Sequence, residues 1–208
     1  KYVADDEKWN RATDALRRAL DANGVAYYEA EGEAAFYGPK ADFQSTDVIG
    51  REWTASTIQV DFILPERLGC EYIGEDGKPH TPVVIHRAVT GTTERFMGLI
   101  IEQYAGAFPL WLAPVQAVII PIADRHLEYA EQVRTRFFDA GFRVEIDGRN
   151  EKTGYKIREA QLQKIPYMLV VGDREAQADA VSVRSRENGD EGSVPVAALL
   201  DRFAGEVR

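Results

Sequence analysis

The chain has 208 residues, a formal net charge of −9 and a single cysteine, Cys70. This length fits one large domain or two small ones, and an apolar fraction of 45% is enough for a packed core. The acidic balance argues against indiscriminate binding to nucleic acid. One cysteine excludes an internal disulfide and fits a reducing compartment, so we expect a cytoplasmic location.

Two features argue against a membrane span or a signal peptide. The longest apolar region, 108–123, is interrupted by three prolines. The first seven residues contain no apolar segment of the kind that a signal peptide needs.

The first part of the chain predicts one helix followed by strands. Apolar residues recur at helical spacing over 6–23 and Gly24 ends the pattern, after which 25–30 reads as a strand. Residues 35–43 read as extended chain bent at Gly38-Pro39, which places Tyr37 and Lys40 at the bend.

The clearest strand covers 53–64 and has one apolar and one polar face. Thr57, Gln59 and Asp61 alternate with apolar residues, so they share a face. That face is either the floor of a small-ligand site or an ordinary solvated sheet surface. A hairpin with its turn at 74–77 is expected over 66–78.

Residues 83–105 predict a buried strand, a tight turn at Gly91 and a helix capped by Thr92 or Thr93. Arg95 is a cation in the first helical turn, where the helix dipole makes a positive charge unfavourable by roughly 0.3–1 kcal/mol. It either binds an anion there or pairs with a carboxylate such as Glu94. His86 is either a metal ligand or an internally bonded histidine.

Beyond a stiff junction at 111–114 the pattern changes to alternating strands and helices. Strands are expected at 115–122, 142–146, 166–171 and 181–186, with helices at 124–140, 152–164 and 194–207. This order predicts a small α/β domain with a largely parallel sheet. Residues 149–186 contain eight Lys/Arg and five Asp/Glu, an excess of +3, which indicates either a nucleic-acid-binding face or a solvated helix face.

Several segments, taken in their order and spacing, resemble the C-terminal part of threonyl-tRNA synthetase, a class II aminoacyl-tRNA synthetase. The resemblance runs along essentially the whole chain. The segments that carry it are Ala35-Phe-Tyr-Gly-Pro-Lys40, Thr57-Ile-Gln-Val-Asp-Phe62, His86-Arg-Ala-Val-Thr-Gly-Thr-Thr-Glu-Arg95, Trp111-Leu-Ala-Pro-Val-Gln116, Arg149-Asn-Glu-Lys152 and Pro166-Tyr-Met-Leu-Val-Val-Gly-Asp173.

The resemblance implies a fold and a domain boundary. It implies the C-terminal half of an antiparallel-sheet class II catalytic domain over 1–113, followed by a small α/β anticodon-binding domain with a mixed, largely parallel sheet over 114–208. The fold class is therefore α+β / α/β.

The resemblance also implies roles for particular residues. Residues 91–95 resemble class II motif 3, whose arginine, here Arg95, holds the ATP phosphates. His86 matches the third ligand of a catalytic zinc ion that holds the amino and hydroxyl groups of threonine. Residues matching positions in the threonine, adenylate and ATP site are Tyr37, Lys40, Thr57 and Gln59, and residues matching anticodon contacts are Asn150, Lys152, Arg158, Glu175 and Arg184.

Two departures from the family pattern are visible. The family usually has glutamine after the tryptophan of the threonine-site strand, where this chain has Thr54. Nothing in the chain resembles motif 1, motif 2, the other two zinc ligands or the editing region, so we expect that the chain begins inside the catalytic domain.

The implied function is threonine–tRNA ligation, with Zn²⁺, Mg²⁺ with ATP, and threonine and tRNA(Thr) as substrates. The resemblance implies a homodimeric full-length enzyme, no membrane association and an isolated fragment without catalysis. The alternative is a synthetase-like tRNA-binding accessory protein without catalysis. A hydrolase that uses Tyr37, Lys40 and Asp61 is a weaker candidate, because no nucleophile is paired with a base.

Overall fold

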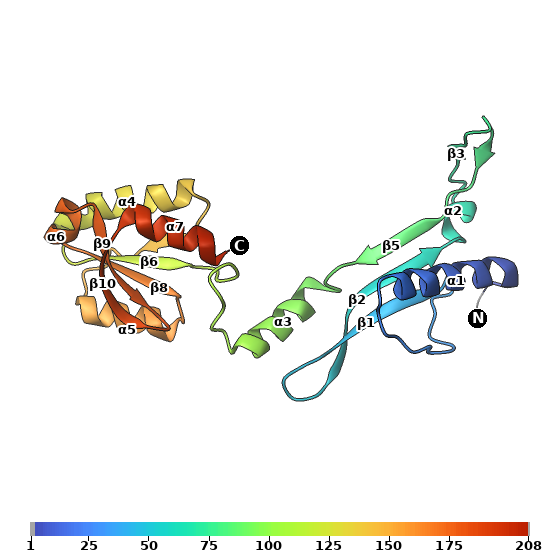
Figure 1. The fold of residues 1–208 in the computed structure, drawn as a ribbon, viewed down its shortest axis with the longest axis horizontal. Helices are drawn as coiled ribbons and strands as arrows, with labels where there is room; N and C mark the ends of the chain where they lie inside the picture. Colours follow the sequence, from blue (N-terminus) through green and yellow to red (C-terminus); the bar gives the residue numbers. More distant parts are fainter. Residues whose placement is uncertain (1–2, 208) are drawn as a thin grey trace. The chain divides into compact units, whose positions relative to one another are not determined.

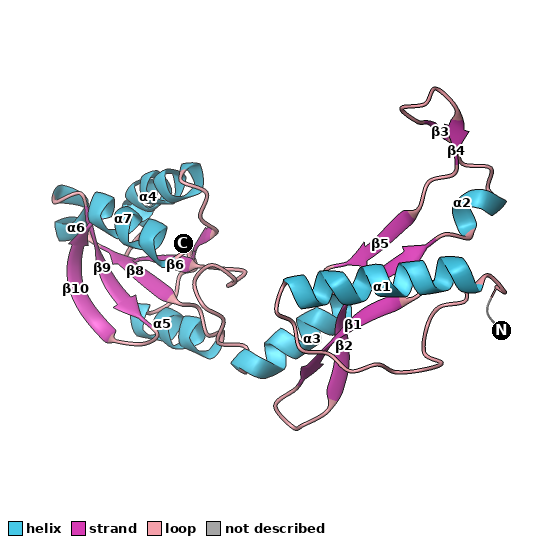
Figure 2. Ribbon diagram, turned by 45° about the vertical axis from the view of Figure 1, so that its right-hand side comes forward, coloured by secondary structure: helices cyan, strands magenta, loops and turns pink. Residues whose placement is uncertain are grey.

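The computed structural model describes residues 3–207 and divides into two compact units, Lys1–Leu99 and Ile100–Arg208. Figures 1 and 2 show both units with their elements. The first unit contains an antiparallel sheet and the second a mixed sheet with interleaved helices, so the predicted α+β / α/β fold class is confirmed. None of the helices formed by the described residues is long and apolar enough to cross a lipid bilayer.

The first unit is built on a three-stranded antiparallel sheet in the order β1-β2-β5. Its elements are α1 (Asp6–Ala22), β1 (Lys40–Thr46), β2 (Glu52–Asp61), α2 (Leu64–Arg67), β3 (Tyr72–Ile73), β4 (Pro79–His80), β5 (Val84–Ala88) and α3 (Thr93–Tyr104), which contains the boundary between the units.

Helix α1 covers the sheet of the first unit in Figure 2. Asp5 caps the helix, because its side chain accepts a hydrogen bond from the amide of Lys8 at 3.1 Å. Ala12 of the helix packs against Phe62 and Ile63 at the end of β2, and this small cluster is the apolar core of the unit.

Two expectations for the first unit are wrong. Residues 25–30 form no strand; Tyr28 is 78% exposed and no partner strand lies beside it among the described residues. The run 83–85 is not buried, since Val83 and Ile85 are 60% and 65% exposed. The reason is topological: β5 pairs only with β2 and so forms an edge of the described sheet.

The second unit is a five-stranded mixed sheet in the order β10-β9-β8-β6-β7, with β7, β6 and β8 parallel. Its elements are β6 (Ala117–Pro121), the 3₁₀ helix η1 (Asp124–His126), α4 (Leu127–Asp139), β7 (Val144–Ile146), α5 (Thr153–Leu162), β8 (Tyr167–Val171), α6 (Asp173–Gln177), β9 (Ala180–Ser185), β10 (Gly189–Pro195) and α7 (Val196–Glu206). The sequence did not predict α6 or β10.

Helices cover both faces of this sheet (Figure 1). Phe137 of α4 and Phe203 of α7 are fully buried on one face, and their rings meet edge to face at 5.2 Å. On the other face Ala160 of α5 packs against Ile120 and Met168. The second unit therefore contains the principal core of the chain.

Candidate functional site

Strand register brings the polar residues of the first unit onto one face of its sheet. Gln59 of β2 lies directly between Lys40 of β1 and His86 of β5, and these three residues form one cross-strand row. Thr57 lies in the next row, opposite Asp42. Because directly opposed residues share a face, the side chains of Lys40, Thr57, Gln59 and His86 gather on the same surface.

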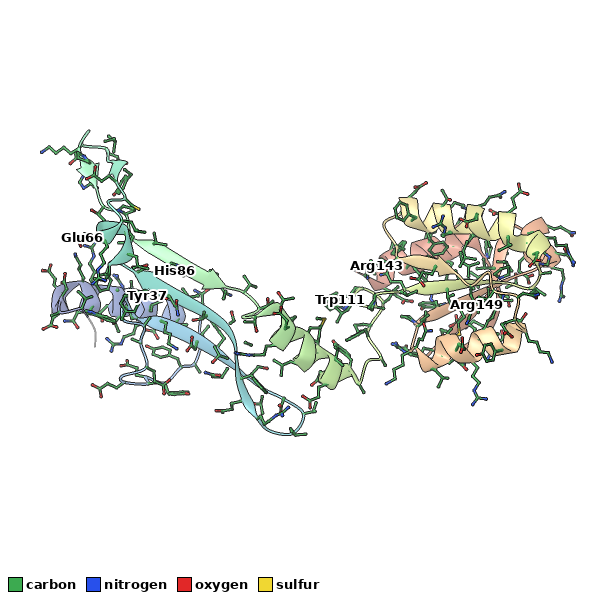
Figure 3. The ribbon with its side chains drawn as sticks, turned by 180° about the vertical axis from the view of Figure 1, so that it is seen from behind. Tyr37, Glu66, His86, Trp111, Arg143 and Arg149 are labelled. Atoms are coloured by element: carbon green, nitrogen blue, oxygen red, sulfur yellow. The ribbon has the colours of Figure 1, made fainter. Side chains whose placement is uncertain are left out.

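Tyr37 reaches this face because the chain before β1 packs directly on β2. The carbonyl of Pro39 accepts the amide of Val60 at 3.0 Å, and a Cβ atom on Gly38 would lie 1.6 Å from the carbonyl oxygen of Val60. Only glycine permits this approach. The Tyr37 hydroxyl then donates to Oε1 of Gln59 at 2.5 Å, and the ring centroids of Tyr37 and His86 are 5.6 Å apart (Figure 3).

Asp42 is a member of this face that sequence reasoning missed. Its carboxylate forms an ion pair with Lys40 and accepts a hydrogen bond from Oγ1 of Thr57 at 2.6 Å. The spacing of Lys40 and Asp42, two residues apart in a strand, was a signal available in the sequence. Asp42 therefore orients two of the residues that the resemblance places in the substrate site.

His86 has a carboxylate partner, Asp61, at the end of β2. Nε2 of His86 lies 2.9 Å from Oδ2 of Asp61, whose side chain is only 2% exposed. Burial raises the pKa of Asp61, but hydrogen bonds from His86 and from the amides of Leu64 and Ile63 outweigh it, so the net pKa is lowered. Asp61 is thus an ionised, fixed partner for the imidazole.

The His86–Asp61 pair fits one part of a zinc site. Metal-bound histidines commonly direct their other ring nitrogen to a carboxylate, and His86, with a 44% exposed side chain, has this arrangement. Within residues 3–207 no three His, Cys, Asp or Glu side chains are grouped so that they could hold a metal ion. The described residues therefore offer one imidazole ligand with its orienting carboxylate.

Arg95 lies in the first turn of α3, after the turn at Gly91. Gly91 has a φ of +64°, and a Cβ atom there would lie 3.1 Å from the carbonyl oxygen of Ala55, so the turn needs glycine. The Arg95 guanidinium lies 5.7 Å from the centroid of the Trp53 ring and forms no ion pair with any residue from 3 to 207. The pairing with Glu94 is absent, and the cation is available to an anionic ligand.

The side-chain amide of Gln44 lies beside Thr54, the residue that departs from the family pattern. A β-bulge leaves Ala55 unpaired, and beyond it Gln44 of β1 lies opposite Thr54. Nε2 of Gln44 donates to Oγ1 of Thr54 at 3.1 Å. Gln44 alternates with Lys40 and Asp42 along β1, so its amide belongs to the polar face and occupies the neighbourhood of the missing glutamine.

In the second unit, three of the residues predicted to contact the anticodon follow the carboxyl ends of parallel strands. Asn150 and Lys152 lie between β7 and α5, and Glu175 lies in α6, directly after β8. Ligands of open α/β sheets bind outside the carboxyl ends of the strands, at the point where the strand order reverses. The Glu175 carboxylate also accepts the amide of Gly172 at 3.1 Å and so caps α6.

The other two predicted anticodon residues, Arg158 and Arg184, lie on α5 and on β9. Arg184 alternates with the buried residues Val181 and Val183, so its side chain lies on the sheet face that carries α5. It pairs with Asp190 at 3.2 Å. Arg158 is exposed, and its guanidinium donates no hydrogen bond to any described residue and forms no ion pair with one.

The excess of positive charge that the sequence shows over residues 149–186 is smaller at the surface of the folded unit. Lys156 of α5 is only 4% exposed and donates to the carbonyl of Asp147 at 2.9 Å. Arg149 is neutralised by Asp147 at 2.7 Å and Glu159 at 2.8 Å. The exposed cations of this segment that no described carboxylate neutralises are therefore Lys152, Arg158, Lys164 and Arg174, together with the partly paired Arg184.

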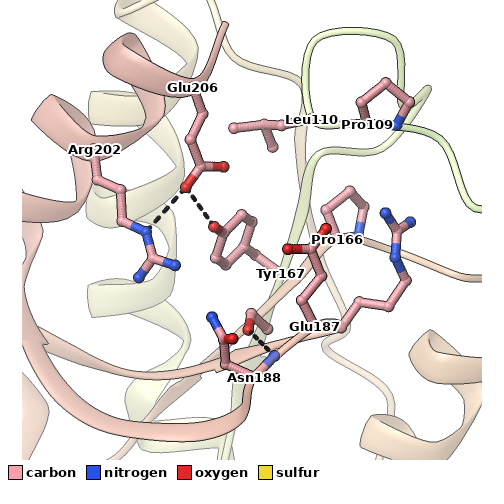
Figure 4. A pocket seen from close by; sticks show the side chains of 10 residues that line it. Pro109, Leu110, Pro166, Tyr167, Glu187, Asn188, Arg202 and Glu206 are labelled. Carbon is pink, nitrogen blue, oxygen red and sulfur yellow. Dashed lines mark hydrogen bonds and ion pairs between the residues drawn. The ribbon is translucent and has the colours of Figure 1, made fainter.

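A cavity of about 390 Å³ in the second unit contains none of the predicted residues (Figure 4). Tyr167 projects into it and donates to Glu206 at 2.7 Å, and Glu206 also accepts from Arg202 at 3.0 Å. Burial and the Glu206 carboxylate raise the pKa of Tyr167. Tyr167, Glu206 and Arg202 are thus occupied by hydrogen bonds to one another, and we interpret the cavity as a structural feature of the unit.

Comparison with known proteins assigns families to both units. The model of the tRNA synthetase class II core domain (G, H, P, S and T) matches residues 4–104, and the anticodon binding domain matches residues 116–206. A threonine–tRNA ligase from Rubrobacter xylanophilus is 62% identical over 208 residues, which are the whole of this chain and 33% of that protein. One from Natranaerobius thermophilus is 56% identical over 100% of this chain and 32% of its own length.

A crystal structure supports the same assignment. The RNA binding domain of threonyl-tRNA synthetase from Cryptosporidium parvum Iowa II has a TM-score of 0.87 and 36% identity, covering 99% of this chain and 52% of that chain. The chain spans about a third of the length of the curated relatives it matches. With both domain models matched in order and relatives above 50% identity along its entire length, the chain belongs to the threonine–tRNA ligase family of class II aminoacyl-tRNA synthetases.

Proposed function

We propose that the protein containing this chain activates threonine with ATP and transfers it to tRNA(Thr). The observation that supports this most directly is the polar sheet face, where Tyr37, Lys40, Thr57, Gln59 and His86 gather within one family-matched domain. Such a face offers hydroxyl, amide and imidazole groups at short range to a small polar substrate.

In this proposal the side chains of the chain bind and orient threonine and ATP, and none of them acts as a general base. Arg95, free of a carboxylate partner, stabilises phosphate charge on ATP, which enters with Mg²⁺. Tyr37, Thr57 and Gln59 line the threonine and adenylate pocket. His86 is a ligand of Zn²⁺, which when bound supplies a Lewis acid for the amino and hydroxyl groups of threonine.

A site that recognises the threonine hydroxyl discriminates strongly against valine, because valine leaves the polar groups of the site unpaired. The polar character of the face, with Thr57 bonded to Asp42 and Gln59 bonded to Tyr37, fits that demand.

We propose that the second unit reads the anticodon, with Asn150, Lys152, Arg158, Glu175 and Arg184 as contacts. Their placement after the carboxyl ends of the parallel strands and on the α5 face supports this, together with the anticodon-domain match. Hydrogen bonds to base edges and stacking on splayed single-stranded bases are the expected mode of recognition. We also propose that the boundary between the two domains lies between residues 113 and 114. We further propose that the full-length protein is a homodimer and that it is cytoplasmic.

The exposed edge of the first unit supports a further part of the proposal, that the active site is completed by additional chain. Val83, directly before β5, and Ile85 of β5 are 60% and 65% exposed, and an apolar sheet edge of this kind is a surface that proteins normally cover. We therefore expect this chain alone to show no threonine-dependent exchange of pyrophosphate into ATP. Exchange clearly above background would contradict this expectation.

Binding of the chain to tRNA(Thr) and to a non-cognate tRNA, measured over a salt series, tests the anticodon proposal. We expect preference for tRNA(Thr) that Arg184→Ala abolishes, while the salt slope reports the phosphate contacts. Arg134→Ala is the matched control, because Arg134 lies on α4 and pairs with Glu131. Equal, weak binding to both tRNAs would contradict the anticodon assignment and favour the accessory-protein alternative.

A further inference from the structure

The Asp61–His86 pair is more constrained than a surface ion pair. Oδ1 of Asp61 accepts the amides of Ile63 at 3.0 Å and Leu64 at 2.9 Å, and Oδ2 lies 2.9 Å from Nε2 of His86. The residue is 1% exposed. One carboxylate oxygen is therefore held by the backbone after β2, which fixes the direction in which the other faces.

This geometry dictates which ring nitrogen of His86 carries hydrogen. An ionised carboxylate only accepts, so Nε2 must be the donor, and in the neutral ring the lone pair then resides on Nδ1. Among residues 3–207 none forms a hydrogen bond with Nδ1. The Tyr37 ring, inclined by 58° at 5.6 Å, packs against the imidazole and restricts its rotation.

We propose that Asp61 is a positioning residue that holds His86 as the Nε2–H tautomer and so reserves Nδ1 for the metal ion. The choice of Zn²⁺ rests on the proposed function, whereas the tautomer rests only on the contacts of Asp61. Asp61 acts through His86 and need not touch substrate.

The two other histidines provide internal references. His126 is 4% exposed, its Nδ1 accepts the amide of Ala123 at 3.2 Å and its Nε2 faces Asp173, so it must also be the Nε2–H tautomer. His80 pairs with Asp76 at the surface, with the two side chains 45% and 49% exposed. A fixed and a solvent-exposed imidazole–carboxylate pair are thus present in the same chain.

Long-range proton–nitrogen correlation spectra of the ¹⁵N-labelled chain above pH 8 test the tautomer. We expect His86 to match His126, with a protonated Nε2 and an unprotonated Nδ1. In Asp61→Asn the side-chain amide can donate to Nε2, so we expect the His86 tautomer to shift toward Nδ1–H. Asp76→Asn, the control, should leave His86 unchanged.

If the spectra of the unsubstituted chain show His86 protonated at Nδ1, or as a mixture of both tautomers, the proposal is overturned. This result does not depend on whether the Asp61→Asn variant folds. A His86 spectrum that Asp61→Asn does not change overturns the proposal as well.

Chelator competition on the full-length protein tests the second part of the proposal, that Nδ1 of His86 binds the metal ion. We expect Asp61→Asn to weaken zinc affinity ten- to a hundredfold, the usual effect of removing a carboxylate behind a metal-bound histidine. Unchanged affinity overturns the positioning role. If the unsubstituted protein holds no zinc, two claims fail: that Nδ1 of His86 binds a metal ion, and that zinc takes part in the proposed function. The tautomer of His86 is tested independently by the spectra.

Discussion

Gly38 fixes the position of Tyr37 over the polar face, and no other residue fits there. A Cβ atom at this position would approach the Val60 carbonyl carbon to 2.8 Å and its oxygen to 1.6 Å, and both are backbone atoms of the central strand. A clash with backbone is relieved only by moving one segment away from the other. The Gly-Pro pair was legible in the sequence as a bend, but its contact with β2 was not.

Gly38→Ala should therefore separate residues 35–39 from β2. We expect the free energy of unfolding of the first unit to fall by about 2 kcal/mol or more, because a backbone clash belongs to the severe class of substitutions. The hydrogen bond between Tyr37 and Gln59 should be lost at the same time. Urea unfolding followed by tryptophan fluorescence measures the first effect.

Gly98→Ala is the matched control for that experiment. Gly98 lies within α3 and a Cβ atom there meets nothing within 4 Å, so alanine should be neutral or stabilising by helix propensity. Equal destabilisation by both substitutions would contradict the role assigned to Gly38.

Individual residues of the site were predictable to different degrees. The alternation of Thr57, Gln59 and Asp61 in one strand showed a polar face without any structure. That His86 would lie opposite Gln59, and Asp42 opposite Thr57, depends on strand register, which loops and the bulge at Ala55 determine. The partners of the site residues were therefore outside the reach of local sequence patterns.

At the scale of elements, errors arose where burial depends on neighbours. The β-branched run at 83–85 predicted a strand correctly in type but wrongly in burial, because nothing local distinguishes an edge strand from a central one. Strand β10 was missed because Gly189 and Gly192 interrupt its pattern. Longer helices with a clear apolar stripe, such as α4 and α7, were placed within a few residues.

Strand β10 is joined to α7 by an ion pair that predicts an acid response of the second unit. Arg202 donates to Glu191 at 2.5 Å and, against the effect of burial, lowers the pKa of Glu191 to about 2. The folded-state pKa is below the ordinary value of 4.5, so the stabilisation is complete above pH 4.5 and is lost as pH falls toward 2. Both side chains keep some solvent access, which limits the contribution to about 1–2 kcal/mol.

Glu191→Gln should lower the unfolding free energy of the second unit near pH 7 by that amount. It should also flatten the dependence of stability on pH between about 4.5 and 2, because glutamine, unlike the Glu191 carboxylate, does not titrate there. Thermal unfolding at a series of pH values measures both effects. Glu187→Gln makes the same charge change at an exposed position nearby, and a variant profile identical to that of Glu187→Gln would refute the assignment.

Helix α5 is fastened to the sheet by a buried lysine. The Lys156 ammonium donates to the carbonyl of Asp147, which follows β7, and contacts that of Pro121 in β6 at 3.5 Å. Lys156→Met keeps the apolar stem and leaves these carbonyls without their donor, so we expect a loss of about 1–3 kcal/mol in unfolding free energy. Lys152→Met, at an exposed position, should cost little, and chemical denaturation of the two variants side by side decides between them.

At the scale of the molecule, the two units differ in how completely they bury apolar surface. The second unit contains the fully buried phenylalanines and valines of the chain, whereas the helix α3 has no buried residue and β5 is largely exposed. The sequence predicted two domains from the change of pattern near 111–114. It could not show how segments on either side of that junction pack, because tertiary contacts of a connecting segment leave no periodic signal.

Residues 108–113 are tied to the second unit, and this determines where a stable fragment can begin. Leu110 is 6% exposed within the main core, Gln116 donates to its carbonyl at 2.8 Å, and Arg143 donates to the carbonyls of Ala113 at 3.0 Å and Trp111 at 2.9 Å. A fragment of residues 106–208 keeps these contacts. A fragment of residues 114–208, cut at the boundary that the sequence predicted, loses all of them.

We expect 106–208 to unfold in one cooperative transition and 114–208 to be less stable by about 2 kcal/mol or more. Removal of a buried leucine accounts for most of that loss, since deleting such side chains from a core typically costs 2–5 kcal/mol. Urea denaturation of the two fragments measures the difference, and Leu110→Ala in 106–208 should reproduce most of it. Equal stability of the two fragments would instead show that residues 106–113 act as a linker, because their contacts would then contribute nothing to the fold that follows.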